Sequence, residues 1–334
     1  MTLPGLSGYL PFVDEAAVAK LVGMADAVEI CRAAYRQYGE GLVQISNPPS
    51  LFLQGIGEAS ARFKVKGAHL RTTGHVGAAG CGFRIAGDVG TSTKEQESEA
   101  HYCYLVDPVS ARPLGVVAQT RLNRMRTAAS GLVTLQALAR GPVRRVALLG
   151  AGRIARPFAE GLPLVFPDAE LVVASRRFES ASALRDEFPR HAIRAVPTIA
   201  EAIADVDAIV TLSNARSPLV DASALRPGLV VLAMGEHHEI AVGLLERVDC
   251  FIVDDLAFAC VMGTCAAWIG RGEVSQEALA VRLDATIGDV IAGRRHGRRQ
   301  PGDTVLAVIQ GMAALDVALA AHCLRHSGQA RTGG

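Results

Sequence analysis

The sequence has few aromatic residues, almost no net charge and no long apolar run, and each of these absences excludes a class of protein. Aromatic residues make up 5% of the 334 positions, and 34 lysines and arginines balance 33 aspartates and glutamates to a formal charge of +1. Nucleic-acid scaffolds carry a basic bias instead. No apolar run approaches the ~20 residues that a membrane-spanning helix needs. We therefore expect neither nucleic acid nor a membrane as a partner.

Seven cysteines are scattered between Cys31 and Cys323, and no two of them form a CxxC pair. Even the closest two, Cys260 and Cys265, are not accompanied by further metal ligands at a suitable spacing. We therefore predict reduced, buried thiols and no metal site. Residues 1–5 contain neither a basic segment nor an apolar stretch, so we expect no signal peptide. These features together predict a cytoplasmic protein.

What the sequence does contain is enough apolar material for a large core. Hydrophobic residues make up 50% of the chain and charged residues 20%, which excludes disorder as a description of the whole. A chain of this length divides into about two domains. From residue 48 to 117, short apolar runs alternate with Gly, Thr and Pro clusters, which indicates an antiparallel or mixed sheet. The predicted strands are 50–54, 62–68, 82–86, 102–106 and 114–120.

After residue 141 the pattern changes to apolar strands that alternate with helical segments, which is typical of a parallel sheet built from βαβ units. We predict a helix at 126–139 and a long apolar helix at 303–324. Asp254 and Asp255 follow the last predicted strand and are interpreted as a helix cap. The predicted strands of this region are 146–149, 171–174, 208–212, 229–233 and 251–253.

The strongest motif lies at residues 150–155, directly after the apolar run 146–149, and has the form G-x-G-x-x-A. In a strand–turn–helix unit, the first glycine permits a tight turn and the second lets the backbone approach a pyrophosphate. The N–H groups at the start of the helix then bind that anion. The motif therefore predicts a dinucleotide site, to which we assign Gly150, Gly152, Arg153 and Ile154.

The residues after the second strand of such a fold distinguish NAD from NADP. An acidic side chain at this point accepts a hydrogen bond from the ribose 2′-hydroxyl of NAD. The sequence instead has Ser175, Arg176 and Arg177, and two guanidinium groups suit a 2′-phosphate. We therefore predict that NADP(H) is preferred, with NAD(H) as the alternative.

Three further segments accompany the glycine motif: Met24–Glu29, Arg126–Ala129 and Gly311–Ala318. Together they resemble the ornithine cyclodeaminase/mu-crystallin family over nearly the whole chain. The resemblance implies an α/β fold in which a Rossmann domain with a parallel sheet (123–309) is joined to an α+β domain. That second domain (1–122 and 310–334) would bind substrate and form a homodimer.

Two positions depart from the family pattern in a way that bears on the substrate. A family methionine aligns with Lys66, and the family's active-site lysine aligns with Arg84. With Arg126 these cations would bind the substrate carboxylate, and three of them also suit a dicarboxylate. The alternative for each is an ion pair at the surface. Lys64 shares the face of Lys66 in a regular strand and is a second candidate.

The family loop that carries the cyclodeaminase aspartate is shortened here to residues 234–239, and the aspartate is absent. Glu236 or His237 takes its place as the group that moves a proton to or from the substrate nitrogen. His69, His75 and His101 remain undistinguished as further pocket residues. The resemblance also implies cofactor contacts at Thr127, Leu212, Ser213 and Met234.

The family's shared chemistry implies hydride exchange at the carbon that bears an amino acid's nitrogen. We therefore predict an NAD(P)-dependent imine reductase or amino-acid dehydrogenase whose substrate is a small amino or imino acid. One alternative is a cyclodeaminase that releases ammonia and recycles NAD. The other is a mu-crystallin-like protein that binds NADPH and a small ligand without turnover.

Overall fold

The computed structural model describes residues 10–54, 61–71, 79–89, 98–139 and 141–329. The chain splits into two compact units. The first comprises the described residues up to 23, from 42 to 123 and from 313 onward, and the second comprises 24–41 and 124–312. This division differs from the expected one mainly in α2 (Met24–Gly39), which packs on α11 (Ile287–Ile291) of the second unit.

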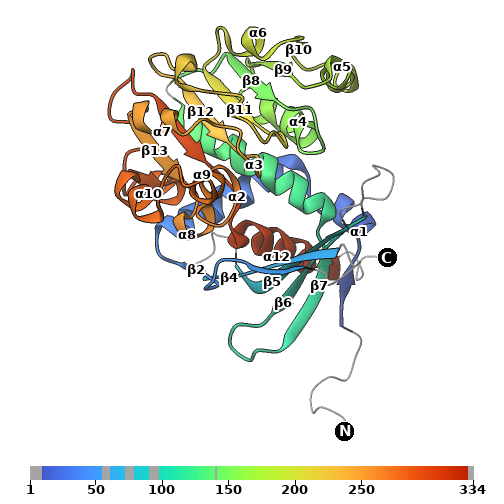
Figure 1. Ribbon diagram of the computed structural model, residues 1–334. Helices are drawn as coiled ribbons and strands as arrows, with labels where there is room; N and C mark the ends of the chain where they lie inside the picture. Colours follow the sequence, from blue (N-terminus) through green and yellow to red (C-terminus); the bar gives the residue numbers. More distant parts are fainter. Residues whose placement is uncertain (1–9, 55–60, 72–78, 90–97, 140, 330–334) are drawn as a thin grey trace. The chain divides into compact units, whose positions relative to one another are not determined.

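The first unit is a seven-stranded sheet with α12 (Ala313–Gln329) along one face (Figure 1). The hydrogen-bonded order is β1-β7-β6-β5-β4-β2, and β3 also pairs with β4. Its strands pair antiparallel except for the parallel pair of β1 and β7. The elements are β1 (Phe12–Val13), α1 (Glu15–Leu21), β2 (Val43–Ile45), β3 (Leu51–Gln54), β4 (Ala61–Leu70), β5 (Gly80–Val89), β6 (Ser98–Val106) and β7 (Pro113–Ala118).

The strand register separates the two faces of this sheet by chemistry. Lys66 lies opposite Arg84, and Arg84 lies opposite Cys103; all three are buried, on the face that α12 covers. Directly opposed residues of an antiparallel sheet share a face, and the next pair along points to the other side. The next opposed pair, Val65 and Ile85, therefore lies on the second face, where apolar side chains are exposed.

The second unit is built on an eight-stranded parallel sheet in the order β10-β9-β8-β11-β12-β15-β13-β14. The chain runs outward from β8 to β10, then returns to start β11 on the other side of β8. This reversal is a topological switch point, where dinucleotides bind at the carboxyl ends of the strands. The strands are β8 (Arg145–Leu149), β9 (Glu170–Ala174), β10 (Ile193–Ala195), β11 (Ala208–Thr211), β12 (Val230–Ala233), β13 (Cys250–Val253), β14 (Ala285–Thr286) and β15 (Val305–Val308).

Helices connect these strands, and the α/β fold class is confirmed. The burial of β11, β12, β13 and β15 is complete along their length, which explains their continuous apolar sequences. No helix in the described residues is both long enough and apolar enough to cross a membrane. The helices of this region are α3 (Thr120–Leu138), α4 (Ala155–Val165), α5 (Phe178–Glu187), α6 (Ile199–Ile203), α7 (Gly243–Arg247), α8 (Leu256–Ala259), α9 (Gly263–Gly270) and α10 (Gln276–Arg282).

The predicted helix at 303–324 is wrong in its first half. Residues 305–308 form β15, which inserts between β12 and β13, and the helix begins only at Ala313. Gly311 separates the two with a φ of 78°, a left-handed conformation that ends regular structure. A four-residue apolar run has no periodicity that distinguishes a buried strand from a buried helix.

Candidate functional site

The turn after β8 has the geometry that the glycine motif predicts. Gly150 has a φ of 127°, and a Cβ at this position would overlap the carbonyl oxygen of Leu212 at the end of β11. Around Gly152 the space is open, because a Cβ there would meet nothing within 4 Å. Helix α4 follows with no acidic residue in its first turn and no side chain capping its N-terminus. The turn therefore offers backbone N–H groups to an anion at the switch point.

The basic residues after β9 are exposed at the same edge of the sheet. Arg176 and Arg177 both reach solvent, and the Ser175 hydroxyl donates to the carbonyl oxygen of Arg177 at 2.5 Å. β9 lies beside β8, so these side chains follow the strand next to the glycine turn. Arg153, in the turn itself, is exposed as well, and Ile154 is half-buried.

The loops after β11 and β12 carry the remaining cofactor candidates. Leu212 and Met234 are buried, and Ser213 is half-buried. The sulfur of Met234 fills the space where a side chain on residue 131 of α3 would lie. The proton-transfer candidates of the loop after β12 differ in exposure, since Glu236 is exposed and His237 half-buried.

His238, by contrast, is buried, and its Nε2 lies 3.2 Å from a carboxylate oxygen of Glu273. The adjacent histidines therefore have separate surroundings. In the described residues no group of three or more His, Cys, Asp or Glu side chains could hold a metal ion.

Arg126 lies in α3 and is 5% exposed. Its guanidinium occupies the space where Gly311 has no side chain. The backbone N–H groups of Gln310 and Gly311 donate to a carboxylate oxygen of Asp254 at 3.1 and 2.5 Å. Asp254 thus fixes the turn against which Arg126 packs. Burial and the neighbouring charge of Asp255 raise the pKa of Asp254 to about 6.

Of the two aspartates interpreted as a helix cap, Asp255 is the one that caps α8. Its side chain accepts the Phe258 N–H at 2.7 Å at the start of that helix. The buried Thr127 follows Arg126 in α3, and its carbonyl oxygen accepts a hydrogen bond from the Ser130 hydroxyl at 2.8 Å.

In the first unit, Lys66 and Arg84 meet at a carboxylate that the sequence did not single out. The Lys66 ammonium lies 3.0 Å from Asp316 Oδ2, and Arg84 Nε lies 3.7 Å from Asp316 Oδ1. The side chains are 2%, 5% and 0% exposed, respectively. Both cations are thus ion-pair partners, as the alternative held, but the pairs are buried and not at the surface. Two buried cations therefore share one carboxylate.

His101 joins this cluster. Its Nδ1 lies 3.1 Å from Arg84 Nη2, and since a guanidinium only donates, Nδ1 must accept and the neutral ring carries its proton on Nε2. The Gln119 amide donates to the backbone carbonyl of Asp316 at 2.7 Å. Lys64 instead lies over the ring of Phe52, 5.7 Å from its centre. His75 lies outside the described residues.

Asp316 and Glu239 are the charged residues that sequence reasoning missed. Asp316 had a signal, because it is the only charged residue between positions 304 and 324, and a lone charge in an apolar helix requires a partner. Glu239 had none. It is fully buried near the end of β12, although it stands in a polar stretch of sequence.

A model of the ornithine cyclodeaminase/mu-crystallin family matches residues 12–328. The chain belongs to this family. The alanine dehydrogenase of Archaeoglobus fulgidus is 27% identical over 307 residues, which cover 91% of this chain and 90% of that enzyme. Delta(1)-pyrroline-2-carboxylate reductase 1 of Burkholderia multivorans is 37% identical over 139 residues, 40% of this chain and 44% of that enzyme.

Among solved structures, an archaeal alanine dehydrogenase dimer with bound NAD matches with a TM-score of 0.85 and 24% identity over 97% of each chain. This match establishes the shared fold. The family model confirms the resemblance found in the sequence to the ornithine cyclodeaminase/mu-crystallin family. Several of the similar solved structures hold NAD or NADH.

Proposed function

We propose that the protein is an NAD(P)-dependent oxidoreductase that interconverts a small amino acid and its imine. The observation that carries the proposal is the buried cluster of Lys66, Arg84 and Asp316, which brings together two cationic side chains of the kind that bind a carboxylate. The open glycine turn after β8 supports a dinucleotide in the other unit. Similarity to alanine dehydrogenase over 91% of the chain supports the same class of reaction.

In this proposal each group has one role. A bound nicotinamide supplies hydride to the imine carbon, or accepts it from the amino acid, at its C4 atom. Arg84 of the first unit and Arg126 of the second are each assigned to the substrate carboxylate, because a guanidinium donates to two oxygens at once. Lys66, held by Asp316, adds positive charge and a proton donor. Glu236 or His237 exchanges the proton at the substrate nitrogen.

The reaction can be tested with a panel of 2-oxo acids and ammonia or methylamine, with NADPH and NADH as reductants. Loss of nicotinamide absorbance that depends on the imine is the expected result. Ammonia release from a diamino acid without net absorbance change would instead establish the cyclodeaminase. Tight NADPH binding with neither signal would establish a binding protein.

Cofactor choice is proposed to depend on the exposed arginines after β9. Replacing Arg176 and Arg177 with alanine removes the groups assigned to the 2′-phosphate. We expect NADPH affinity to fall by about 2–4 kcal/mol, since a hydrogen bond to a charged group contributes about 1.5–3 kcal/mol, while NADH affinity changes little. Calorimetry on both cofactors measures this difference. Equal losses for the two would show that the arginines do not read the phosphate.

The uncovered face of the first unit's sheet supports a homodimer. A soluble monomer rarely exposes a contiguous apolar patch larger than a few hundred Å², and five of the seven strands expose apolar side chains on this face. The related alanine dehydrogenase structure is a dimer, so we propose a second copy of this chain as the occupant. The exposed apolar side chains of the face are Phe12, Leu51, Leu53, Phe63, Phe83, Ile85 and Tyr102.

A charge at the centre of this face should separate the dimer. Ile85 lies opposite Val65 on one side and Tyr102 on the other, so Ile85→Asp places a carboxylate among apolar neighbours. We expect light scattering at micromolar concentration to give a dimer for the wild type and a monomer for this variant. Val281→Asp, at an isolated position on α10 that is 89% exposed, is the control and should stay dimeric. A monomeric wild type would overturn the proposal.

We also propose a cytoplasmic location. All seven cysteines are free thiols, and three of them, Cys103, Cys250 and Cys265, are buried with pKa values raised by desolvation. Reduced thiols fit a reducing compartment. Fractionation of the source cells would test the assignment.

A further inference from the structure

Glu239 is a buried carboxyl group to which the proposed reaction assigns no role. Its side chain is 0% exposed. Oε1 accepts the backbone N–H of Ser213 at 2.7 Å and also a hydrogen bond from the Ser213 hydroxyl. The backbone carbonyl of Glu239 accepts the Leu219 N–H at 2.7 Å. The residue is therefore anchored at both its backbone and its carboxyl group.

The other carboxylate oxygen of Glu239 lies against Gly235, directly after β12. A Cβ on Gly235 would overlap that oxygen, so any other residue at this position would displace the carboxyl group. The Gln310 side-chain amide donates to the Gly235 carbonyl at 3.3 Å. One carboxyl group thus connects the loop after β11, through Ser213, with the loop after β12, through Gly235.

The Ser213 side chain is occupied within its own loop. Its hydroxyl donates to Glu239 and accepts the N–H of Ala215 at 3.1 Å. Both its donor and an acceptor site are therefore used to shape the backbone. These bonds tie the loop after β11 to Glu239.

The position of the loops after β11 and β12 in the sheet indicates which half of a dinucleotide they would contact. The glycine turn after β8 and the arginines after β9 belong to the pyrophosphate and the adenosine ribose. β11 and β12 follow β8 on the opposite side from β9, and a dinucleotide extends across the switch point between the two halves of such a sheet. The loops after β11 and β12 therefore belong to the nicotinamide half. The turn contacts this side directly, because Gly150 packs on the Leu212 carbonyl.

We propose that Glu239 is a positioning residue for the nicotinamide half of the cofactor site. It acts through Ser213 and Gly235, whose loops it holds at the carboxyl ends of β11 and β12. The inference rests on the proposed function in that it takes a nicotinamide dinucleotide as the ligand. Burial raises the pKa of Glu239, and the Ser213 hydrogen bonds oppose that shift; the fold keeps a carboxyl group here despite its desolvation cost.

The experiment compares three ligands on the full-length protein: NADPH, NADH and ADP, which lacks the nicotinamide half. Glu239→Ala leaves the Ser213 N–H and hydroxyl without their acceptor. We expect its Kd for the better-bound dinucleotide to rise about 10-fold or more, as loss of a charge-assisted bond implies, with the Kd for ADP nearly unchanged. Glu239→Gln keeps an acceptor oxygen and should recover most of the affinity.

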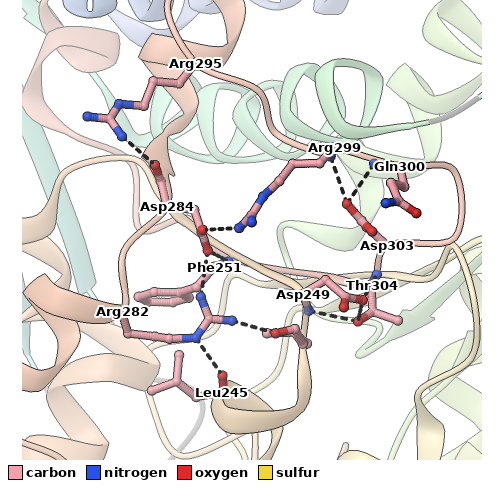
Figure 2. A network of polar contacts seen from close by, with 11 residues as sticks. Leu245, Asp249, Phe251, Arg282, Asp284, Arg295, Arg299, Gln300, Asp303 and Thr304 are labelled. Atoms are coloured by element: carbon pink, nitrogen blue, oxygen red, sulfur yellow. Dashed lines mark hydrogen bonds and ion pairs between the residues drawn. The ribbon is translucent and has the colours of Figure 1, made fainter.

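A matched control lies at the opposite edge of the same sheet. Asp249 accepts the backbone N–H and the hydroxyl of Thr304 at 2.7 and 2.8 Å, just before β13 and β15 begin (Figure 2). This is the same pair of bonds that Ser213 makes to Glu239, but away from the nucleotide edge. Asp249→Asn should change neither dinucleotide nor ADP affinity.

The outcomes separate the inference from the proposed function. If the wild type binds neither NADPH nor NADH, the proposed function fails. If the wild type binds a dinucleotide and both Glu239 variants bind it equally well, the positioning role is excluded. A Glu239→Gln variant that loses ADP and dinucleotide affinity equally would also exclude it, because the effect would then extend to the whole domain. Nicotinamide fluorescence, which reports the surroundings of the bound ring, should differ between Glu239→Ala and Asp249→Asn.

Discussion

Replacing Arg126 with alanine should lower kcat/KM by at least about 100-fold, because losing one charge-assisted bidentate contact to a carboxylate costs about 3 kcal/mol. Cofactor affinity should change little, since the Gly150 turn is made by other residues. Arg126→Lys should restore only part of the activity, because an ammonium cannot reproduce the planar, two-pronged donor geometry. Steady-state kinetics and cofactor titration on each variant measure the two effects separately.

Gly311→Ala offers a second way to disturb the same group without removing its charge. A methyl group on Gly311 would overlap the Arg126 guanidinium, so the side chain must move. We expect kcat/KM to fall here too, together with some stability, because the φ of 78° at this position is strained for alanine. A destabilised Arg126→Ala protein with unchanged kcat/KM would remove Arg126 from the substrate site.

Asp316→Ala should destabilise the fold more than any surface change, by about 3–5 kcal/mol, because it leaves two buried cations without their shared carboxylate. Lys66 and Arg84 are 2% and 5% exposed and lie 3.0 and 3.7 Å from Asp316. Water therefore cannot replace the lost carboxylate without opening the packing of α12 on the sheet. The free energy of unfolding in urea measures the loss.

A double-mutant cycle isolates the pair. Lys66→Met leaves Asp316 paired with Arg84, whereas Asp316→Asn takes the carboxylate from both cations. The double variant leaves only Arg84 without it, so it should be less destabilised than the sum of the singles. The exposed pair of Glu29 and Arg32, 3.4 Å apart, is the control, and Glu29→Ala should cost at most about 1 kcal/mol. A similarly small loss for Asp316→Ala would show that the buried pair contributes no more than a surface one.

Local pattern was enough to predict most of the fold. Alternating glycine-separated runs predicted β3 to β7 of the first unit, and continuous apolar runs predicted β8, β9, β11, β12 and β13 of the second, because strand burial is recorded in sequence periodicity. The short strands β1, β2, β10 and β14 were not predicted. β15 was missed because its neighbours in the sheet, β12 and β13, are distant in sequence. Its pairing follows from the tertiary fold alone.

In the candidate site, too, the local features were predicted and the long-range contacts were not. The glycine turn is a local motif, and its geometry at Gly150 and Gly152 follows from adjacent residues. The carboxylate that Lys66 and Arg84 share is that of Asp316, which lies in a helix more than 200 positions later in the sequence. Sequence spacing identifies cations and carboxylates as candidates, but it does not state which of them meet.

The late position of β15 and α12 has a consequence for how the protein is made. Each unit is completed by a segment from the last part of the chain: β15 inserts between β12 and β13 of one sheet, and α12 covers the other and brings Asp316. Domains usually fold as they leave the ribosome, N-terminal parts first. The strands of the first sheet are translated well before residues 305–329, so we expect this sheet to complete its packing only after the helix that carries Asp316 has emerged.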